Sequence, residues 1–260
     1  MNVLVFDIET VPDVDYGRTL LGLGDLAETE VAKAMAAQRR QETGGSEFLP
    51  LEQHRVVAIA CVLRSGDSLK VWSLGEVESS EAELVQRFFD GIERFRPDLV
   101  SWNGSGFDLP VLTYRALKHR VAAPQFWEMG DSDNAFRWNN YVNRYHARHT
   151  DLMDVLSFYQ ARARASLADM AVLLGLPGKL GFSGAQVWDV WRGGQQLAVR
   201  RYCETDVLNT FLIYLRYQLL RGVLDRERLQ AEERRVRDWL TASAEPHWRE
   251  FLAAWPETGP

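Results

Sequence analysis

The 260-residue sequence contains only two cysteines, Cys61 and Cys203. It has no apolar run near the roughly 20 residues that a membrane-spanning helix requires. Two cysteines provide no framework of disulfides, so we expect a reduced, cytoplasmic protein. The N-terminus has no basic flank and carries an acid at Asp7, which argues against a signal peptide. These absences disfavour an integral membrane protein and a disulfide-rich secreted domain.

The sequence also lacks an excess of positive charge: it contains 30 Lys and Arg and 36 Asp and Glu, and its formal net charge is −6. A protein that coats long duplex DNA needs an extensive basic surface, so this class is disfavoured. A nuclease remains compatible, since bound metal ions reverse the local charge of an acidic pocket. Zinc is disfavoured, because His146 and His149 have no further Cys or His at a matching spacing.

Acidic residues are present in three short motifs, of which the first lies near the N-terminus. The apolar run Val3–Phe6 predicts a buried strand that leads into Asp7 and Glu9. Side chains alternate along a strand, so these two acids share one face. Two neighbouring carboxylates without a basic partner are costly to ionise unless a cation binds between them. The alternative is an ordinary strand end with two solvated acids.

The second motif follows a strand predicted over residues 98–102. Gly104 and Gly106 provide turn chemistry, and a helix is predicted to begin at Asp108. One interpretation is that Asp108 simply caps the helix N-terminus. The two roles are compatible, because charged ligands collect where a helix N-terminus lies at the end of a strand.

The third motif lies in an amphipathic helix predicted over residues 195–221. Tyr202 and Asp206 are four residues apart, so they lie on one helix face. Alone, this pair would be read as a half-buried tyrosine beside a solvated acid. Taken with the other motifs, it predicts a pocket of four carboxylates: Asp7, Glu9, Asp108 and Asp206. Such oxygen ligands favour Mg²⁺ or Mn²⁺.

The three motifs together resemble those of the DEDD superfamily of 3′–5′ exonucleases, in the DEDDy branch whose third motif is Tyr-x-x-x-Asp. Over residues 2–221 the chain is similar to the proofreading exonuclease domain of family-B DNA polymerases. The resemblance implies an α/β, ribonuclease H-like fold and hydrolysis by a two-metal mechanism. It assigns the two Mg²⁺ or Mn²⁺ ions to the four carboxylates, and it gives Tyr202 the task of orienting the attacking water.

Five further residues are expected to bind substrate: Asn103, Phe107, Arg137, Trp138 and Lys179. Lys179 and Phe182 match a loose pattern that family-B exonucleases carry ahead of the third motif, although a solvated loop lysine would match it too. Arg137 and Trp138 belong to a long loop over residues 122–149. Its interleaved aromatic and basic residues suit single-stranded nucleic acid. The alternative is that these aromatic residues cover the sheet edge.

The remaining elements predict a mixed five-stranded sheet flanked by helices. Three antiparallel strands come first, followed by alternating helices and strands, whereas a doubly wound nucleotide-binding sheet would begin strand–helix–strand. The fifth strand or a helix is expected to begin at residues 149–154. We expect a ribonuclease H-like domain over residues 1–221 with a helical insertion at about 11–50, and a C-terminal helical extension over 222–260.

The function expected from the sequence is metal-dependent 3′–5′ exonuclease activity on single-stranded nucleic acid with a free 3′ end, with DNA favoured over RNA. One alternative is a haloacid-dehalogenase-like phosphatase, whose nucleophilic Asp also precedes a second acid by two residues. Here that second acid is Glu9, and Tyr202 and Asp206 have no role in such an enzyme. The other is a catalytically silent nucleic-acid-binding module, which gains nothing from clustered negative charge.

Overall fold

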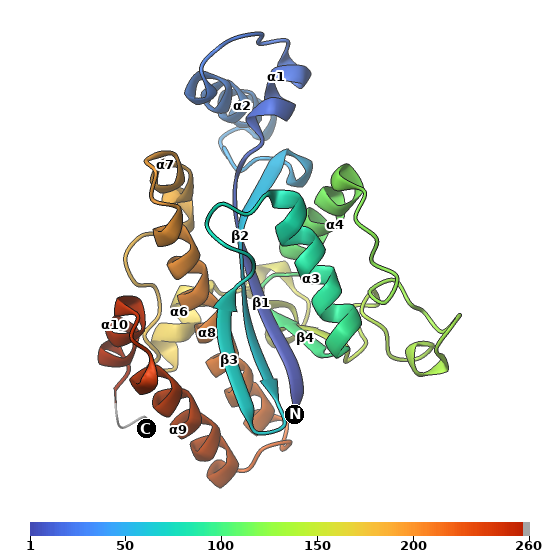
Figure 1. Cartoon of the computed structure of the whole chain (residues 1–260), viewed down its shortest axis with the longest axis vertical. Helices are drawn as coiled ribbons and strands as arrows, with labels where there is room; N and C mark the ends of the chain where they lie inside the picture. Colours follow the sequence, from blue (N-terminus) through green and yellow to red (C-terminus); the bar gives the residue numbers. More distant parts are fainter. Residues whose placement is uncertain (257–260) are drawn as a thin grey trace.

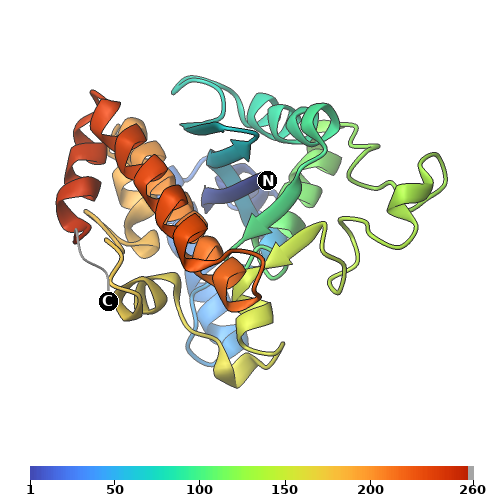
Figure 2. The same cartoon turned by 90° about the horizontal axis from the view of Figure 1, so that it is seen from below.

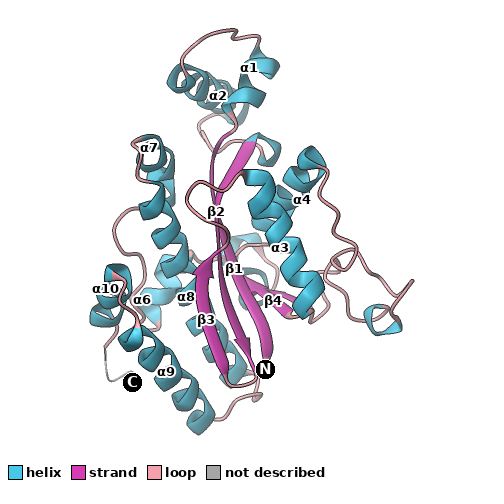
Figure 3. Ribbon diagram, viewed as in Figure 1, coloured by secondary structure: helices cyan, strands magenta, loops and turns pink. Residues whose placement is uncertain are grey.

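A five-stranded sheet in the order β3-β2-β1-β4-β5 forms the centre of the molecule (Figure 3). The computed structural model describes residues 1–256. The strands are β1 (Asn2–Pro12), β2 (His54–Ser65), β3 (Ser68–Ser73), β4 (Asp98–Ser101) and β5 (His149–Asp151). The first three pair antiparallel, while β1, β4 and β5 pair parallel. The mixed sheet predicted from the order of elements is therefore confirmed.

Helices cover both faces of this sheet because β1 is apolar on both sides (Figure 2). Val3 and Val5 pack toward α8 (Gln196–Leu220). Leu4 and Phe6 belong to the opposite core, which is covered by α3 (Glu81–Phe95) and α4 (Asp108–His119). The odd-numbered residues of β1 therefore face α8, and this alternation sets the direction of Asp7 and Glu9.

The insertion between β1 and β2 forms a small helical lobe beyond the end of the sheet (Figure 1). It contains α1 (Val14–Leu21) and α2 (Glu28–Thr43), which enclose a separate apolar cluster. The helical insertion begins slightly after the expected position of about residue 11, because β1 continues through Pro12. Thr10, Val11 and Pro12 still pair with β2 beyond a β-bulge that follows Glu9.

The remaining helices lie after β5. They are α5 (Leu152–Leu156), α6 (Leu167–Leu173), α7 (Val187–Arg192), α9 (Arg226–Ala242) and α10 (Pro246–Ala254). Short 3₁₀ helices cover Leu51–Gln53, Asn134–Phe136, Ala161–Ala163 and Gly184–Gln186. Helices α9 and α10 bury Val236, Trp248 and Phe251, which confirms the helical C-terminal tail. Over residues 1–256, no helix combines the length and the hydrophobicity needed to cross a membrane.

The loop at residues 122–149 divides its aromatic side chains between two roles. Phe126, Phe136 and Tyr141 are buried in the core under α3 and α4, and the Tyr141 hydroxyl donates a 2.7 Å hydrogen bond to the Pro97 carbonyl. In contrast, Trp138 is 82% exposed. The packing interpretation therefore holds for the first three rings, and the exposed ring remains available for a ligand.

A buried ion network connects α4 to the insertion and to α3. The Arg115 guanidinium on α4 donates 2.6 Å and 2.5 Å hydrogen bonds to Asp13 and Glu81. Asp13 caps α1, and Glu81 also accepts a hydrogen bond from the backbone N–H of Val56 on β2. Arg115 therefore helps to fix α4, whose first residue is Asp108.

We predict that Arg115→Ala lowers the free energy of unfolding by about 3–5 kcal/mol, because it leaves the Asp13 and Glu81 carboxylates buried without their shared partner. The control is Arg87→Ala, which removes an exposed pair with Glu83 and is expected to cost no more than about 1 kcal/mol. Urea denaturation measures both values. Equal losses in the two variants would contradict the structural role of the network.

Candidate active site

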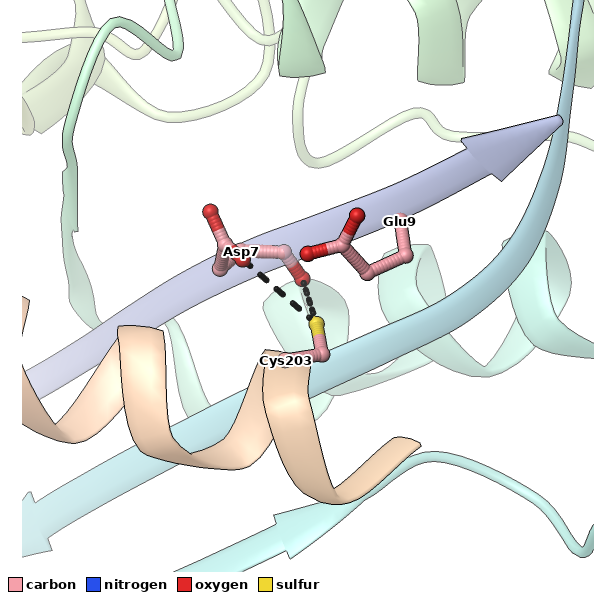
Figure 4. Close-up of side chains that lie close together, drawn as sticks. All are labelled: Asp7, Glu9 and Cys203. Carbon is pink, nitrogen blue, oxygen red and sulfur yellow. Dashed lines mark hydrogen bonds between the residues drawn. The ribbon is translucent and has the colours of Figure 1, made fainter. Parts of the chain in front are cut away.

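Asp7 and Glu9 of β1 point toward α8 from the same strand face, and both approach Cys203 (Figure 4). One oxygen of each carboxylate and the Cys203 sulfur all lie within 4.8 Å of one another. Glu9 is 9% exposed, so this face is not an open surface. The arrangement brings two carboxylates of β1 against the helix that contains Tyr202 and Asp206.

Asp108 reaches the same region from the start of α4. Its carboxylate accepts a 3.1 Å hydrogen bond from the backbone N–H of Ile8, between the two acids of β1. The interpretation of Asp108 as an ordinary N-cap is wrong, because Phe107 occupies the cap position and α4 has no side-chain cap. Asp108 is instead the first helical residue, and its side chain turns toward β1.

Tyr202 and Asp206 complete the cluster from one face of α8, where they are 4% and 7% exposed. The Phe182 ring packs against the Tyr202 ring with 4.6 Å between centroids. The Lys179 ammonium lies 5.9 Å from the centre of the Tyr202 ring. Asp206 Oδ1 is buried and has no hydrogen-bond partner in the part of the chain that the structure describes.

Burial raises the pKa of all four carboxylates, and the charges of the neighbouring acids add to this effect at Asp7 and Glu9. Burial, followed by the charges of Asp108, Glu9 and Asp206, raises the pKa of Asp7 well above its ordinary value. Burial and the charges of Asp206 and Asp108 do the same for Glu9. Burial raises the pKa of Asp108 to about 7 and that of Asp206 to about 6. The cluster therefore binds protons tightly at the pH values where isolated carboxylates are ionised.

This donor set fits a hard divalent cation. Within residues 1–256 none of the four carboxylates takes part in an ion pair with a basic side chain. The unpartnered Asp206 oxygen is a free ligand atom of the kind that Mg²⁺ and Mn²⁺ prefer. A cation would replace mutual repulsion with attraction. The residues that would hold it are Asp7, Glu9, Asp108 and Asp206.

The Tyr202 hydroxyl is a proton donor and not a base. Burial, followed by the negative charges of Asp206 and Glu9, raises the pKa of Tyr202 well above its ordinary value. The phenol therefore stays protonated at neutral pH. A protonated phenol beside two carboxylates can orient a water molecule or an oxygen of a ligand.

Cys203 contacts the acidic cluster, a contact that the sequence motifs did not indicate. Its thiol donates to the Asp7 carbonyl at 3.3 Å and lies 3.5 Å from Asp7 Oδ2. Burial and the charge of Asp7 raise the pKa of Cys203 well above its ordinary value, so the sulfur stays protonated. A signal existed in the sequence, because Cys203 lies three residues before Asp206 on the same helix.

Asn103 and Phe107 belong to the turn that precedes Asp108. Asn103 adopts a left-handed conformation with φ of 65°, and its carbonyl accepts the Phe107 N–H at 2.9 Å. The Asp151 carboxylate holds this turn by accepting the backbone N–H groups of Asn103 and Ser105 at 2.9 Å each. The Phe107 ring packs beside Phe48, whose side chain is 58% exposed. The turn therefore places an aromatic surface next to Asp108.

Arg137 and Trp138 are placed differently from Lys179. Within residues 1–256, neither Arg137 nor Trp138 contacts the four carboxylates of the cluster. They belong to the 122–149 loop, which projects away from α8 in both views (Figures 1 and 2). Lys179 lies near Glu9 and Asp206, where its positive charge partly offsets the rise in their pKa values that burial causes. The structure thus brings Lys179, but not the loop pair, to the acidic cluster.

A family model described as "Predicted 3'-5' exonuclease related to the exonuclease domain of PolB" matches residues 46–255. The chain belongs to this family. The match includes Asp108, Tyr202 and Asp206 and begins after Asp7 and Glu9, so the position of the β1 acids beside α8 is a separate observation. The resemblance to family-B exonuclease domains is thereby confirmed.

A solved structure of the family B DNA polymerase from the hyperthermophilic archaeon Pyrobaculum calidifontis is similar in fold, with a TM-score of 0.50 and 18% sequence identity. The similarity covers 85% of this chain and 24% of the polymerase, so the chain spans about a quarter of that protein. It confirms the predicted α/β fold class. No curated protein matches this chain.

The raised pKa values generate a prediction for the metal-free protein. Folding raises the pKa of Asp206 from 3.8 to about 6, so its stabilising contribution is present at low pH and lost as pH rises through this interval. Asp206→Asn carries no such charge. In a chelator, its melting temperature should increasingly exceed that of the parent as pH rises, and excess Mg²⁺ should reverse the order.

Asp67→Asn is the control for this pair of melting curves, because the Asp67 side chain is fully exposed. Its difference from the parent should not vary with pH in the same interval. A constant difference between Asp206→Asn and the parent at every pH would show that folding does not raise the pKa of Asp206.

Proposed function

We propose that this chain is a metal-dependent 3′–5′ exonuclease that hydrolyses phosphodiester bonds of single-stranded nucleic acid, with DNA favoured over RNA. The observation that carries the proposal is the convergence of buried carboxylates from β1, α4 and α8, which form no ion pair with a basic side chain in residues 1–256. Membership of a family of predicted 3′–5′ exonucleases supports the reaction and its polarity.

Two divalent cations, Mg²⁺ or Mn²⁺, would supply charge neutralisation and a more acidic bound water when present. Asp7 would be a central ligand of the metal site, because the charges of Glu9, Asp108 and Asp206 all raise its pKa. Glu9 of β1 and Asp206 of α8 lie close together on the α8 side of the sheet, and Asp108 approaches them from α4. Cys203 would restrict the Asp7 side chain through its thiol hydrogen bond.

Tyr202 would orient the attacking water through its hydroxyl. The phenol remains protonated, and the ring is held by Phe182, so the hydroxyl direction is fixed by packing. Lys179, which is close to Glu9 and Asp206, would contact a phosphate oxygen of the substrate. These residues position the reacting groups, which is a major contribution to catalysis.

The turn at Asn103 and Phe107 would bind the 3′-terminal nucleotide. Exposed aromatic rings stack on bases of any sequence, and Phe107 with Phe48 offers such a surface beside Asp108. Arg137 and Trp138 would contact the strand further from the carboxylates. In this proposal the loop assists binding and takes no part in the reaction.

The two alternatives account for less of the site. A haloacid-dehalogenase-like phosphatase would use Asp7 and Glu9 but has no role for Tyr202 and Asp206. A silent binding module would bear the cost of burying four unpaired carboxylates without benefit from their chemistry. Both alternatives predict no metal-dependent release of mononucleotides.

The test of the proposal uses linear single-stranded DNA and RNA labelled at the 5′ end, together with a closed circular single strand. We expect stepwise shortening of linear strands from the 3′ end with Mg²⁺ or Mn²⁺, faster on DNA, with nucleoside 5′-monophosphates as products. The circle should remain intact. Rapid cutting of the circle, or no metal-dependent shortening of either linear strand, would contradict the proposal.

Variants of Tyr202 and Asp7 test the division of roles. Tyr202→Phe removes only the hydroxyl and should lower the single-turnover rate by about 10- to 100-fold, the range seen for groups that orient a metal site. Asp7→Asn should lose considerably more activity, because it removes a charged ligand from the centre of the carboxylate cluster. Tyr214→Phe, on the same helix and also buried, should retain parent activity. Parent-like rates for Tyr202→Phe would reduce Tyr202 to a packing residue.

A further inference from the structure

A second group of basic and aromatic side chains comes from the end of the 122–149 loop, just before β5, and from the segment that follows α5. We call it the arginine–aromatic patch, and its members are Arg144, Tyr145, Phe158, Tyr159, Arg162 and Arg164. The Tyr145 and Phe158 side chains are 72% and 82% exposed, so packing within the chain does not explain them.

The patch has a fixed frame. Buried Asp154 accepts hydrogen bonds from Arg144 at 2.9 Å and Arg164 at 2.6 Å. The Arg144 guanidinium lies 5.7 Å from the ring centre of Tyr145 and 4.9 Å from that of Tyr159. The two rings meet edge to face at 5.2 Å. One buried acid thus organises two cations and two aromatic rings into a single surface.

The backbone of the patch is strained. Phe158 and Tyr159 are consecutive residues in the left-handed region, with φ of 53° and 60°. Bulky residues rarely adopt this conformation, and each instance costs on the order of 1–3 kcal/mol. The Tyr159 N–H donates a 2.8 Å hydrogen bond to the Asp154 carbonyl, which holds the turn. The strained turn leaves the Phe158 ring exposed to solvent, so burial of this ring does not compensate for the strain.

A cavity of about 540 Å³ lies between the arginines of the patch and the turn that leads into α4. Arg144, Asp154 and Arg164 line one part of it. Gly106 and Leu109, which flank Phe107 and Asp108 in the sequence, line another part. The segment that follows β5 appears in yellow in Figure 2, next to the end of the sheet. A ligand in this cavity would reach the turn that carries Asp108.

We propose that the arginine–aromatic patch binds the single-stranded part of the substrate that leads toward the carboxylates, which rests on the proposed exonuclease function. Bases stack on the exposed rings, and phosphates pair with the arginines. Three arginines against one buried acid make the patch positive in a chain of net charge −6. In the described part of the chain, exposed Arg162 forms no ion pair, so it can bind a phosphate.

The direct test is binding of fluorescent oligothymidylates of about 4 and about 16 nucleotides, the range of single-strand site sizes, in a chelator that prevents cleavage. The double variant Tyr145→Ala/Phe158→Ala should bind the longer strand at least about five-fold more weakly than the parent, since each ring contributes base stacking. The short strand, which cannot span both sites, should show a smaller change.

Two controls belong to this experiment. Phe95→Ala removes an exposed ring at the end of α3 and should leave binding of both strands unchanged. Arg162→Glu should weaken binding of the longer strand and lower the slope of log affinity against log salt by about one, as expected when a phosphate contact is lost. Circular dichroism melting establishes that all variants are folded.

The outcomes separate this inference from the exonuclease proposal. If the parent degrades linear strands and the double variant binds and degrades the longer one as the parent does, the patch has no role and the inference is overturned. If the parent shows no nuclease activity but the double variant loses affinity for the longer strand, the patch stands and the proposed function fails.

Discussion

Mutual repulsion among four buried carboxylates is the constraint on which the rest of this structure depends. Asp7 and Glu9 point to one side of β1, where Asp206 and Asp108 approach them from two different helices. Burial raises the pKa of every member, and like charge raises those of Asp7 and Glu9 further. A fold that keeps such a cluster together without a basic partner must hold its supporting elements firmly, because each acid alone favours solvent.

The supports are recognisable on both sides of the sheet. Arg115 ties α4 to Asp13 and Glu81, which secures the element that carries Asp108. On the other side, Glu204 of α8 accepts hydrogen bonds from the backbone N–H and hydroxyl of Ser73 at 3.0 Å and 2.7 Å, and pairs with His247 of α10 at 2.8 Å. The C-terminal helices therefore help to fix α8, on which Tyr202 and Asp206 flank Glu204 in the sequence.

Local patterns were sufficient for the features that depend on periodicity. The alternation of β1 placed Asp7 and Glu9 on one face, and helical spacing placed Tyr202 and Asp206 together. Helical spacing places Cys203 near Asp206, but it does not identify Asp7 as the residue that Cys203 contacts, because α8 is buried on most sides. Asp108 was ambiguous for a similar reason, since its hydrogen bond to the Ile8 N–H joins residues 100 positions apart.

Irregular segments were the least predictable part. The 122–149 loop has no periodicity, so its sequence did not indicate that Phe126, Phe136 and Tyr141 pack inward while other rings stay exposed. The short helix α7 was missed because six residues give too little pattern. The arginine–aromatic patch joins this loop to the segment after α5, and only the fold brings them together.

Calorimetric titration of Mn²⁺ into the metal-free protein, in buffers of different ionisation enthalpy, tests the central claim most directly. Because the raised pKa values retain protons in the cluster, the account predicts that binding releases protons and that the measured enthalpy depends on the buffer. Asp7→Asn should greatly weaken this binding. Equal Mn²⁺ affinity in the parent and in folded Asp7→Asn, with no proton release from the parent, would contradict the account.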